Sequence, residues 1–261
     1  GCIEALPQDR RLRLHRIRKE DFGHGRTRNL GVQLARGKYV AFITQDAIPA
    51  NRMWLMNLIA PLQNDPRVAG VFGCHIAHTD HGQLTAIDLD QHFNRWIYKS
   101  HRQPIELDAG RQTANGAVSS HERFYSDNNS CLRKCIWKTL PLPDVVYGED
   151  QLWAQEILRK GYRKAYASTA VVRHSHEYGF RETVLRANTE WHFYNQLLGE
   201  RLPSSKQEVL EMVERSCSKD LQAQKLYPNI TKNDLTLRRK LHFARACGYY
   251  LAGKGVGEIR P

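Results

Sequence analysis

Residues 38–46 read Lys-Tyr-Val-Ala-Phe-Ile-Thr-Gln-Asp, and this stretch decides the fold class. Its centre is apolar at every position, which is typical of a strand that is buried on both faces in the middle of a sheet. A helix is expected before it over residues 27–36, and another after it over 53–60. A second apolar strand follows over residues 68–73. Buried strands that alternate with helices predict an α/β fold with right-handed crossovers.

The second half of the sequence continues this alternation and then changes character. We expect a helix over residues 149–160 and a strand over 163–172. The sequence from residue 180 onward contains many residues of both charges and few β-branched residues, which is typical of helices. We expect about three helices in it. We therefore place an α/β domain at residues 1–179 and a helical C-terminal extension at residues 180–261. The remaining text predicts a strand over 11–17, loops with short helices over 75–116 and a short helix within 130–140.

Composition narrows the class of protein. A chain of 261 residues with 41% hydrophobic and 25% charged residues is typical of a globular protein and excludes a disordered or collagen-like one. No apolar run approaches the ~20 residues of a membrane span, and the first residues do not read as a secretory signal. The 6 cysteines are too scattered for a disulfide framework. We expect a cytoplasmic protein with free thiols and, from the net charge of +12, a basic surface.

Three groups of residues are candidates for chemistry. Asp46 follows a buried strand, at the edge where open α/β sheets bind ligands, and its carboxylate can hold a divalent cation or simply form a turn. Glu149 and Asp150 open a helix, where one carboxylate can cap the helix and the other can act as a general base. His174 and His176 alternate at a strand end, so their side chains share a face and can bind metal or phosphate. Each group taken alone is better explained by an ordinary structural role.

The order of these groups is more specific than any one of them. The ordered motifs are HGxxRNxG over residues 24–31, YVAFITQDA over 39–47, NSCxR over 129–133, PLP over 141–143, EDQxWA over 149–154 and AVVxHSH over 170–176. Together they resemble the family 2 inverting glycosyltransferases of the GT-A fold, and in particular the rhamnosyltransferase-like branch. The resemblance runs from Phe22 to Tyr178. It implies a GT-A-type, mostly parallel sheet flanked by helices.

The resemblance also implies roles for individual residues. Asp46 matches the last acidic position of the Asp-x-Asp motif that binds Mg2+ or Mn2+ under the donor diphosphate, and His176 would supply a further ligand. Asp150 matches the catalytic base. The other matches are Arg28 and Asn29 beside the donor diphosphate, and Asn129, Ser130 and Glu149 on the acceptor side.

The implied reaction moves a sugar, with rhamnose as the leading expectation, from a nucleotide-sugar donor to a glycan or lipid-linked acceptor. Such a reaction belongs to cell-surface polysaccharide synthesis, so we expect the protein in the cytoplasm, with peripheral contact to the inner membrane face. The basic charge is expected to serve diphosphates and the membrane surface rather than nucleic acid. Family members begin with strands that hold the nucleotide base. The resemblance starts after them, which predicts a domain that lacks roughly 40–60 residues, the size of a βαβ unit.

Three alternatives stay open at this point. The excess of basic residues also suits a nucleic-acid-binding protein, although the sequence shows no recognised binding motif. The run Cys74-His75-x-x-His78-x-x-His81 also suits a zinc-binding protein without catalytic activity, although no Cys-x-x-Cys pair accompanies it. A chain that lacks the first strands would be a glycosyltransferase fragment without activity of its own.

Overall fold

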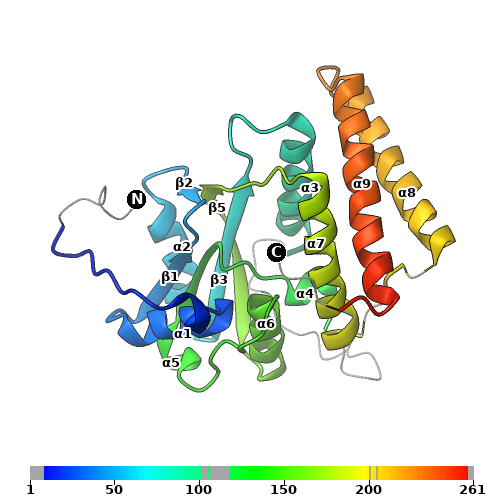
Figure 1. Cartoon of the computed structure of the whole chain (residues 1–261). Coiled ribbons are helices and arrows are strands. Elements are labelled where there is room, and N and C mark those ends of the chain that lie inside the picture. The colour runs from blue at the N-terminus through cyan, green and yellow to red at the C-terminus, as the bar shows by residue number, and fades with distance from the viewer. Residues whose placement is uncertain (1–8, 101–104, 106–117, 200, 204, 258–261) are drawn as a thin grey trace.

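The computed structural model describes residues 9–100, 105, 118–199, 201–203 and 205–257 (Figure 1). Its elements are, in chain order, η1 (Lys19–Asp21), α1 (His24–Leu34), β1 (Tyr39–Ile43), β2 (Ile48–Pro49), α2 (Trp54–Asn64), β3 (Val68–Ile76), α3 (Gln83–Ser100), α4 (Ser120–Arg123), β4 (Asn129–Arg133), α5 (Lys134–Trp137), α6 (Glu149–Arg159), β5 (Arg163–Arg173), α7 (Phe180–Trp191), η3 (His192–Leu197), α8 (Lys206–Leu226) and α9 (Lys232–Gly253). The α/β class and the helical C-terminal extension are thereby confirmed.

The sheet is mixed rather than mostly parallel. The described strands form a 5-stranded sheet in the order β1-β4-β3-β5-β2. β3 and β5 run parallel, whereas the pairs β1–β4, β3–β4 and β2–β5 are antiparallel. The difference arises at β4, because we expected a short helix rather than a strand within residues 130–140. Cys131 of β4 pairs with Ala41 on one side and with Val71 on the other, so β4 runs antiparallel between two strands that we expected to form a parallel sheet.

Apolar side chains pack on both faces of the sheet. On one face, Leu58 and Leu62 of α2 pack against side chains of β3, β4 and β5. On the other face, α1, α3 and α6 contribute a larger cluster that contains Val32, Trp96 and Trp153. Burial of these side chains, worth about 1.5–3 kcal/mol for each large one, fixes the helices on the sheet. The sheet is thus a rigid platform whose strand ends can position functional groups.

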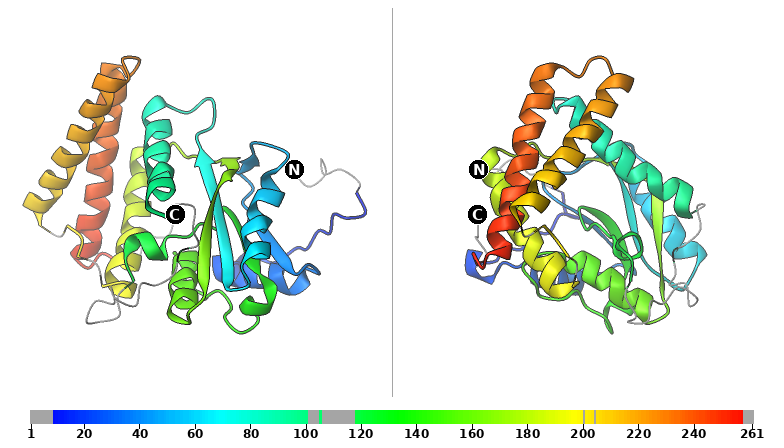
Figure 2. Two further views of the ribbon diagram at one scale, coloured as in Figure 1. Left: turned by 180° about the vertical axis from the view of Figure 1, so that it is seen from behind. Right: turned by 90° about the vertical axis from the view of Figure 1, so that its right-hand side faces the viewer.

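The C-terminal helices form a separate stack beside the sheet (Figure 2). α7 and α9 approach so closely that a Cβ on Gly248 would lie 2.4 Å from the carbonyl oxygen of Val184. Only glycine permits this backbone contact. α8 packs on the outer side of α9 through Val209, Val213 and Ala246. The stack is therefore held by small residues on α9 rather than by a wide apolar stripe.

Three local predictions were wrong. Residues 11–17 form no strand and are exposed, because the apolar half of the alternating pattern has no sheet to pack against. Residues 83–100 form the long helix α3, where we expected loops, and its Phe93 and Trp96 enter the core. α2 continues through Pro61 to Asn64. In the part of the chain that the structure describes, no helix is both long and apolar enough to cross a membrane.

Candidate active site

The first part of the site lies where the ends of β1 and β5 meet. Asp46 stands in the turn that joins β1 to β2, and His174 and His176 directly follow β5. Ile48 of β2 pairs with Arg173 of β5, so this antiparallel contact brings the turn and the histidines together. The sequence predicted each group separately, and the pairing that unites them comes from the fold.

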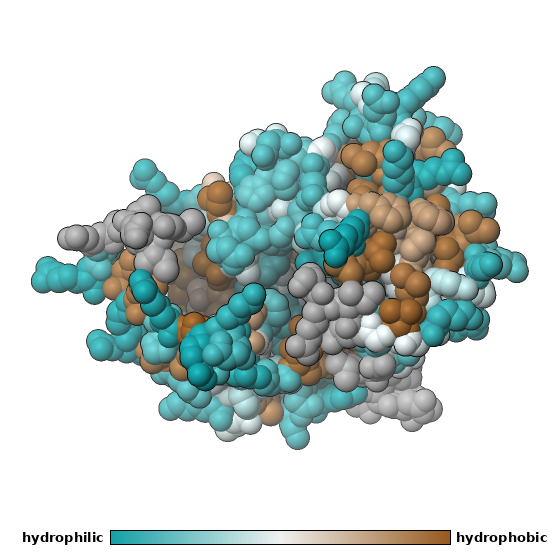
Figure 3. Space-filling view, viewed as in Figure 1, coloured by the Kyte–Doolittle hydropathy of each residue, from teal (hydrophilic) through white to brown (hydrophobic). Residues whose placement is uncertain are grey.

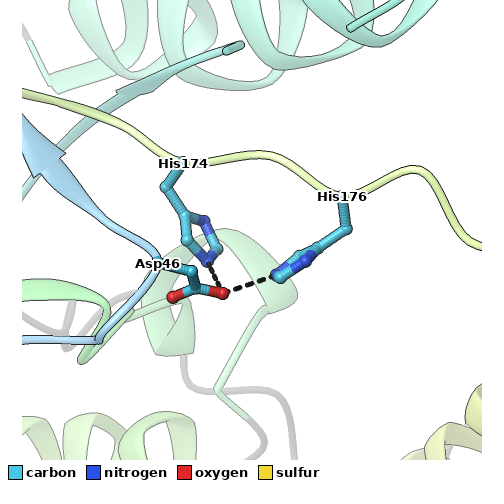
Figure 4. A group of neighbouring side chains, drawn as sticks. All are labelled: Asp46, His174 and His176. Carbon is cyan, nitrogen blue, oxygen red and sulfur yellow. Dashed lines mark ion pairs between the residues drawn. The ribbon is translucent and has the colours of Figure 1, made fainter. Parts of the chain in front are cut away.

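The three side chains converge on one point (Figure 4). Nε2 of His174 lies 3.5 Å, and Nε2 of His176 3.4 Å, from Oδ2 of Asp46. The other carboxylate oxygen, Oδ1, is buried and has no hydrogen-bond partner within the described structure. Burial lowers the pKa of both histidines, which keeps their ring nitrogens neutral and able to donate a lone pair to a metal. The three ligand atoms lie within 4.8 Å of one another and fit a divalent cation.

Further histidines support this metal corner from outside. Nε2 of His78 donates to the backbone carbonyl of Asp46 at 3.2 Å, which holds the turn in place. Oγ of Ser175 accepts from the backbone N–H of His78 at 2.9 Å and lies 2.5 Å from Nδ1 of His81. Among the described residues, the run from Cys74 to His81 forms no metal-ligand group of its own. The zinc site suggested by that run is therefore not formed.

The second part of the site is a group of buried carboxyls around one arginine. Nε of Arg28, on α1, lies 3.4 Å from Oδ2 of Asp127, and its Nη1 forms an ion pair with Glu149 at the start of α6. The side chains of Arg28, Asp127 and Glu149 are only 15%, 1% and 6% exposed. Oγ of Ser130 donates to the other oxygen of Asp127 at 2.7 Å. Arg28 is thus neutralised within the protein rather than held out toward a ligand.

Asp150 lies beside this group and is better exposed than its two acidic neighbours. Its Oδ2 accepts from the backbone N–H of Asp127 at 3.2 Å and its Oδ1 from that of Gln151 at 2.8 Å. Burial raises the pKa of Asp150, and raises those of Asp127 to about 7 and Glu149 to about 8, against the lowering effect of Arg28. With three carboxyls and one arginine, the group binds protons near neutral pH, as a general base requires.

A two-residue link joins the carboxyl group to the metal corner. Asp127 donates its backbone N–H to Asp150, and Nδ2 of the next residue, Asn128, lies 3.4 Å from Nε2 of His174. The candidate base and the candidate metal ligands are therefore neighbours in one site. The sequence analysis missed both Asp127 and Asn128. Their signal is the pair Asp127-Asn128 immediately before a strand, which can be recognised only once residues 129–133 are known to form that strand.

Three other candidates are used inside the protein. Oδ1 of Asn29 accepts from the indole N–H of Trp137 at 2.8 Å and from the backbone of Leu142, so it braces the loop of residues 141–143. Asn129 and Ser130 are strand residues of β4 rather than loop residues, and both are fully buried. The side chain of Asn129 binds the carbonyls of Cys74 and Ala170. The side-chain polar atoms of Asn29, Asn129 and Ser130 are therefore already hydrogen-bonded within the protein. The same atoms would be needed to bind the donor at Asn29, or the acceptor at Asn129 and Ser130.

Comparison with known proteins gives a family match and two similar relatives. Residues 3–119 match the family model described as glycosyl transferase family 2. The chain thus contains a family 2 glycosyltransferase sequence over residues 3–119. Within this family it is similar to the O-antigen chain rhamnosyltransferase RfbN of Salmonella typhimurium, with 30% identity over 178 residues that cover 67% of this chain and 53% of the relative. It is similar to the O-antigen chain rhamnosyltransferase WbaN of Salmonella anatum, with 30% identity over 173 residues, 65% of this chain and 51% of the relative.

The fold also has a counterpart among solved glycosyltransferases. The mannosyltransferase PcManGT from Pyrobaculum calidifontis, solved in complex with GDP-Man and Mn2+, superimposes with a TM-score of 0.50 at 15% identity, covering 88% of this chain and 66% of that one. This likeness supports the GT-A fold. The family 2 glycosyltransferase described here spans about half the length of the two rhamnosyltransferases that it matches.

Proposed function

We propose that this glycosyltransferase transfers rhamnose, with inversion, from a nucleoside-diphosphate donor to a glycan acceptor in cell-surface polysaccharide assembly. The leading donor is deoxythymidine-diphosphate rhamnose. The observation that carries the proposal is the joined site, in which Asp150 and the group of Asp46, His174 and His176 are linked through residues 127 and 128. The names of the two Salmonella relatives support the choice of rhamnose.

Asp46, His174 and His176 would hold the divalent cation. When bound, the ion neutralises the negative charge of the departing diphosphate. The ligand set contains two imidazole nitrogens and one carboxylate, whereas Mg2+ prefers oxygen ligands almost exclusively. We therefore favour Mn2+ over Mg2+, and the Mn2+ in the PcManGT complex is consistent with this choice.

Asp150 would take the proton of the acceptor hydroxyl. Glu149 and Asp127 are both nearly inaccessible, whereas Asp150 is half-buried and reaches the surface of the site. Two backbone N–H groups hold its carboxylate, which fixes its direction and leaves lone pairs for a substrate hydroxyl. A base that activates the hydroxyl on the face opposite the leaving group gives direct displacement, and direct displacement inverts the anomeric centre.

The test is transfer of rhamnose from deoxythymidine-diphosphate rhamnose by the Asp150→Asn variant. Loss of a general base typically lowers the rate by about 100- to 10,000-fold, so we expect at least a 100-fold loss. Asp144→Asn is the matched control, because Asp144 is exposed and its only described ionic partner is the exposed Arg26. Near-normal transfer by the folded Asp150→Asn variant would remove the base assignment. An inactive wild-type protein that binds neither donor nor Mn2+ would remove the proposed reaction.

We further propose that the outer helices contact an anionic membrane surface. Figure 3 shows apolar residues gathered over the side of the molecule that carries α8 and α9. Leu237 and Phe243 of α9 are 59% and 45% exposed, and the exposed Arg239 and Lys240 lie between them in sequence. Exposed apolar side chains mixed with basic ones suit a surface of anionic lipid headgroups. A lipid-linked acceptor would be presented at such a surface.

Sedimentation with vesicles tests this membrane contact. We expect the protein to sediment with vesicles that contain phosphatidylglycerol and not with phosphatidylcholine vesicles. The double variant Arg239→Gln/Lys240→Gln should sediment less, because juxtamembrane basic residues contribute about 1 kcal/mol each. Equal sedimentation of wild type and variant with both kinds of vesicle would contradict the proposal.

A further inference from the structure

A departing diphosphate carries more negative charge than one divalent cation balances. Arg28, which we expected beside the diphosphate, already pairs with carboxylates of the protein. Arg28 forms ion pairs with Asp127 and Glu149 inside the protein. Its guanidinium is therefore already balanced by carboxylates. A site that neutralises a diphosphate favours a further cation that is not committed to the protein itself.

Arg186 of α7 lies at the end of a column of stacked planar groups that starts at the metal corner. The ring of His176 stacks on that of Tyr178, with centroids 4.9 Å apart and planes inclined by 15°. The guanidinium of Arg186 in turn lies 4.3 Å from the centroid of Tyr178. Because His176 also contacts Asp46, the column leads directly from the candidate metal ligands to Arg186. A contact of this kind with the face of a ring leaves the N–H donors of the guanidinium unused.

The positive charge of Arg186 acts on residues from more than one element of the site. It interacts electrostatically with His24 at the start of α1 and with Tyr147 in the loop before Asp150. Arg186 is exposed, and within the described residues it forms no ion pair with a carboxylate. Its positive charge therefore acts on the metal corner, where Glu182 of the same helix also acts on His176.

We propose that Arg186 binds a diphosphate, with its guanidinium donating to phosphate oxygens beside the metal corner. Arginine presents parallel N–H donors that match two oxygens of a phosphate, which is the geometry that the stacked column leaves open. The diphosphate belongs to the donor or to a lipid-diphosphate-linked acceptor, which share this chemistry. The inference rests on the proposed function. It adds a residue from the C-terminal extension to a site otherwise built from the sheet domain.

The experiment compares Arg186→Gln with Arg181→Gln. Arg181 is an exposed arginine on the same helix, so its loss changes the net charge equally. Binding of inorganic pyrophosphate in the presence of Mn2+ is measured by calorimetry, and binding of Mn2+ alone is measured separately. Charge-assisted hydrogen bonds contribute enough that we expect about tenfold weaker pyrophosphate binding in Arg186→Gln. Arg181→Gln should bind as wild type does, and all three proteins should bind Mn2+ equally.

The outcomes separate the inference from the function on which it rests. Equal pyrophosphate affinity in the two variants would overturn the role of Arg186 and leave the proposed reaction intact. A wild-type protein that does not bind pyrophosphate at all would overturn the diphosphate chemistry itself. Repeating the titration with thymidine diphosphate and with geranyl diphosphate identifies the source. The ligand whose affinity falls in Arg186→Gln is the class that Arg186 holds, and either result supports the proposal.

Discussion

Replacing Arg28 by methionine would leave two buried carboxyls without their cation. Methionine keeps much of the volume of arginine but carries no charge, so the substitution isolates the electrostatic contribution. The side chains of Asp127 and Glu149 are 1% and 6% exposed, and water cannot compensate for the loss. Breaking a buried pair by removing one partner costs about 3–5 kcal/mol. This is a large share of the ~5–15 kcal/mol by which a typical domain is stable.

The loss should depend on pH, and its direction follows from the raised pKa values. The pKa of Asp127 is about 7 and that of Glu149 about 8, above their ordinary values of 3.8 and 4.5. The native state therefore holds more protons than the unfolded state between these limits, and the free energy of unfolding falls as the pH rises. Without Arg28 both pKa values rise further. The difference between wild type and Arg28→Met should thus be small near pH 5 and widen toward pH 8.

Urea unfolding from pH 5 to 8 measures this effect, with Arg26→Met as the matched control. Arg26 lies two residues earlier on α1, and its ion pair with Asp144 is exposed, with side chains 55% and 50% accessible. Such a surface pair contributes about 0–1 kcal/mol. Adding Glu149→Gln to Arg28→Met should recover part of the lost stability. The reasoning is refuted if the two arginine variants lose equal stability, or if the loss in Arg28→Met does not change with pH.

Three further outcomes follow from local geometry. Gly148→Ala should cost about 1–3 kcal/mol more than Gly161→Ala in chemical denaturation, because both glycines have positive φ but only at Gly148 would a Cβ meet the ring of Phe193, 2.1 Å away; equal losses would contradict this. His174→Ala should weaken Mn2+ binding at least about tenfold by calorimetry, as expected for removal of a ligand, and unchanged affinity would exclude it from the set. Burial lowers the pKa of Lys164 well below its ordinary value, so the native state holds fewer protons and stability rises with pH; Lys164→Met should flatten this rise between pH 7 and 10, and an unchanged slope would show that the lysine stays charged.

The sequence was sufficient where burial makes a pattern continuous. β3 is a buried apolar run inside the sheet, and α6 begins at the predicted Glu149. β1, which we expected in the middle of the sheet, is instead the edge strand of the described sheet, so its apolar pattern gave its class but not its position. β4 was not predictable in this way, because Asn129, Ser130 and Arg133 are polar residues in a fully buried strand. Their polar atoms are satisfied by distant partners, such as the carbonyl of Val68 for Arg133. The local pattern of apolar and polar residues cannot predict hydrogen bonds to partners that are distant in sequence.

The site divides in the same manner. Asp46, Glu149, Asp150 and the two histidines became candidates because each stands at the beginning or the end of a predicted element. Asp127 was missed because its importance depends on the burial around Arg28, which arises only when α1 and α6 meet. Asn29 was assigned to the donor because of its neighbour in the motif. Its amide instead holds a loop, a contact across more than a hundred residues of sequence.

The contact between Gly148 and Phe193 has a consequence for the order in which the protein becomes competent during synthesis. The ring that packs against the base-bearing loop belongs to a segment made forty-five residues after it, and the preceding helix α7 is itself braced by α9 through Gly248. During synthesis, α7, Phe193 and α9 are made after the strands of the sheet and α6. The loop before Asp150 therefore acquires its final support only after α9 has been synthesised, and shortened products that end before α9 should carry an unsupported base.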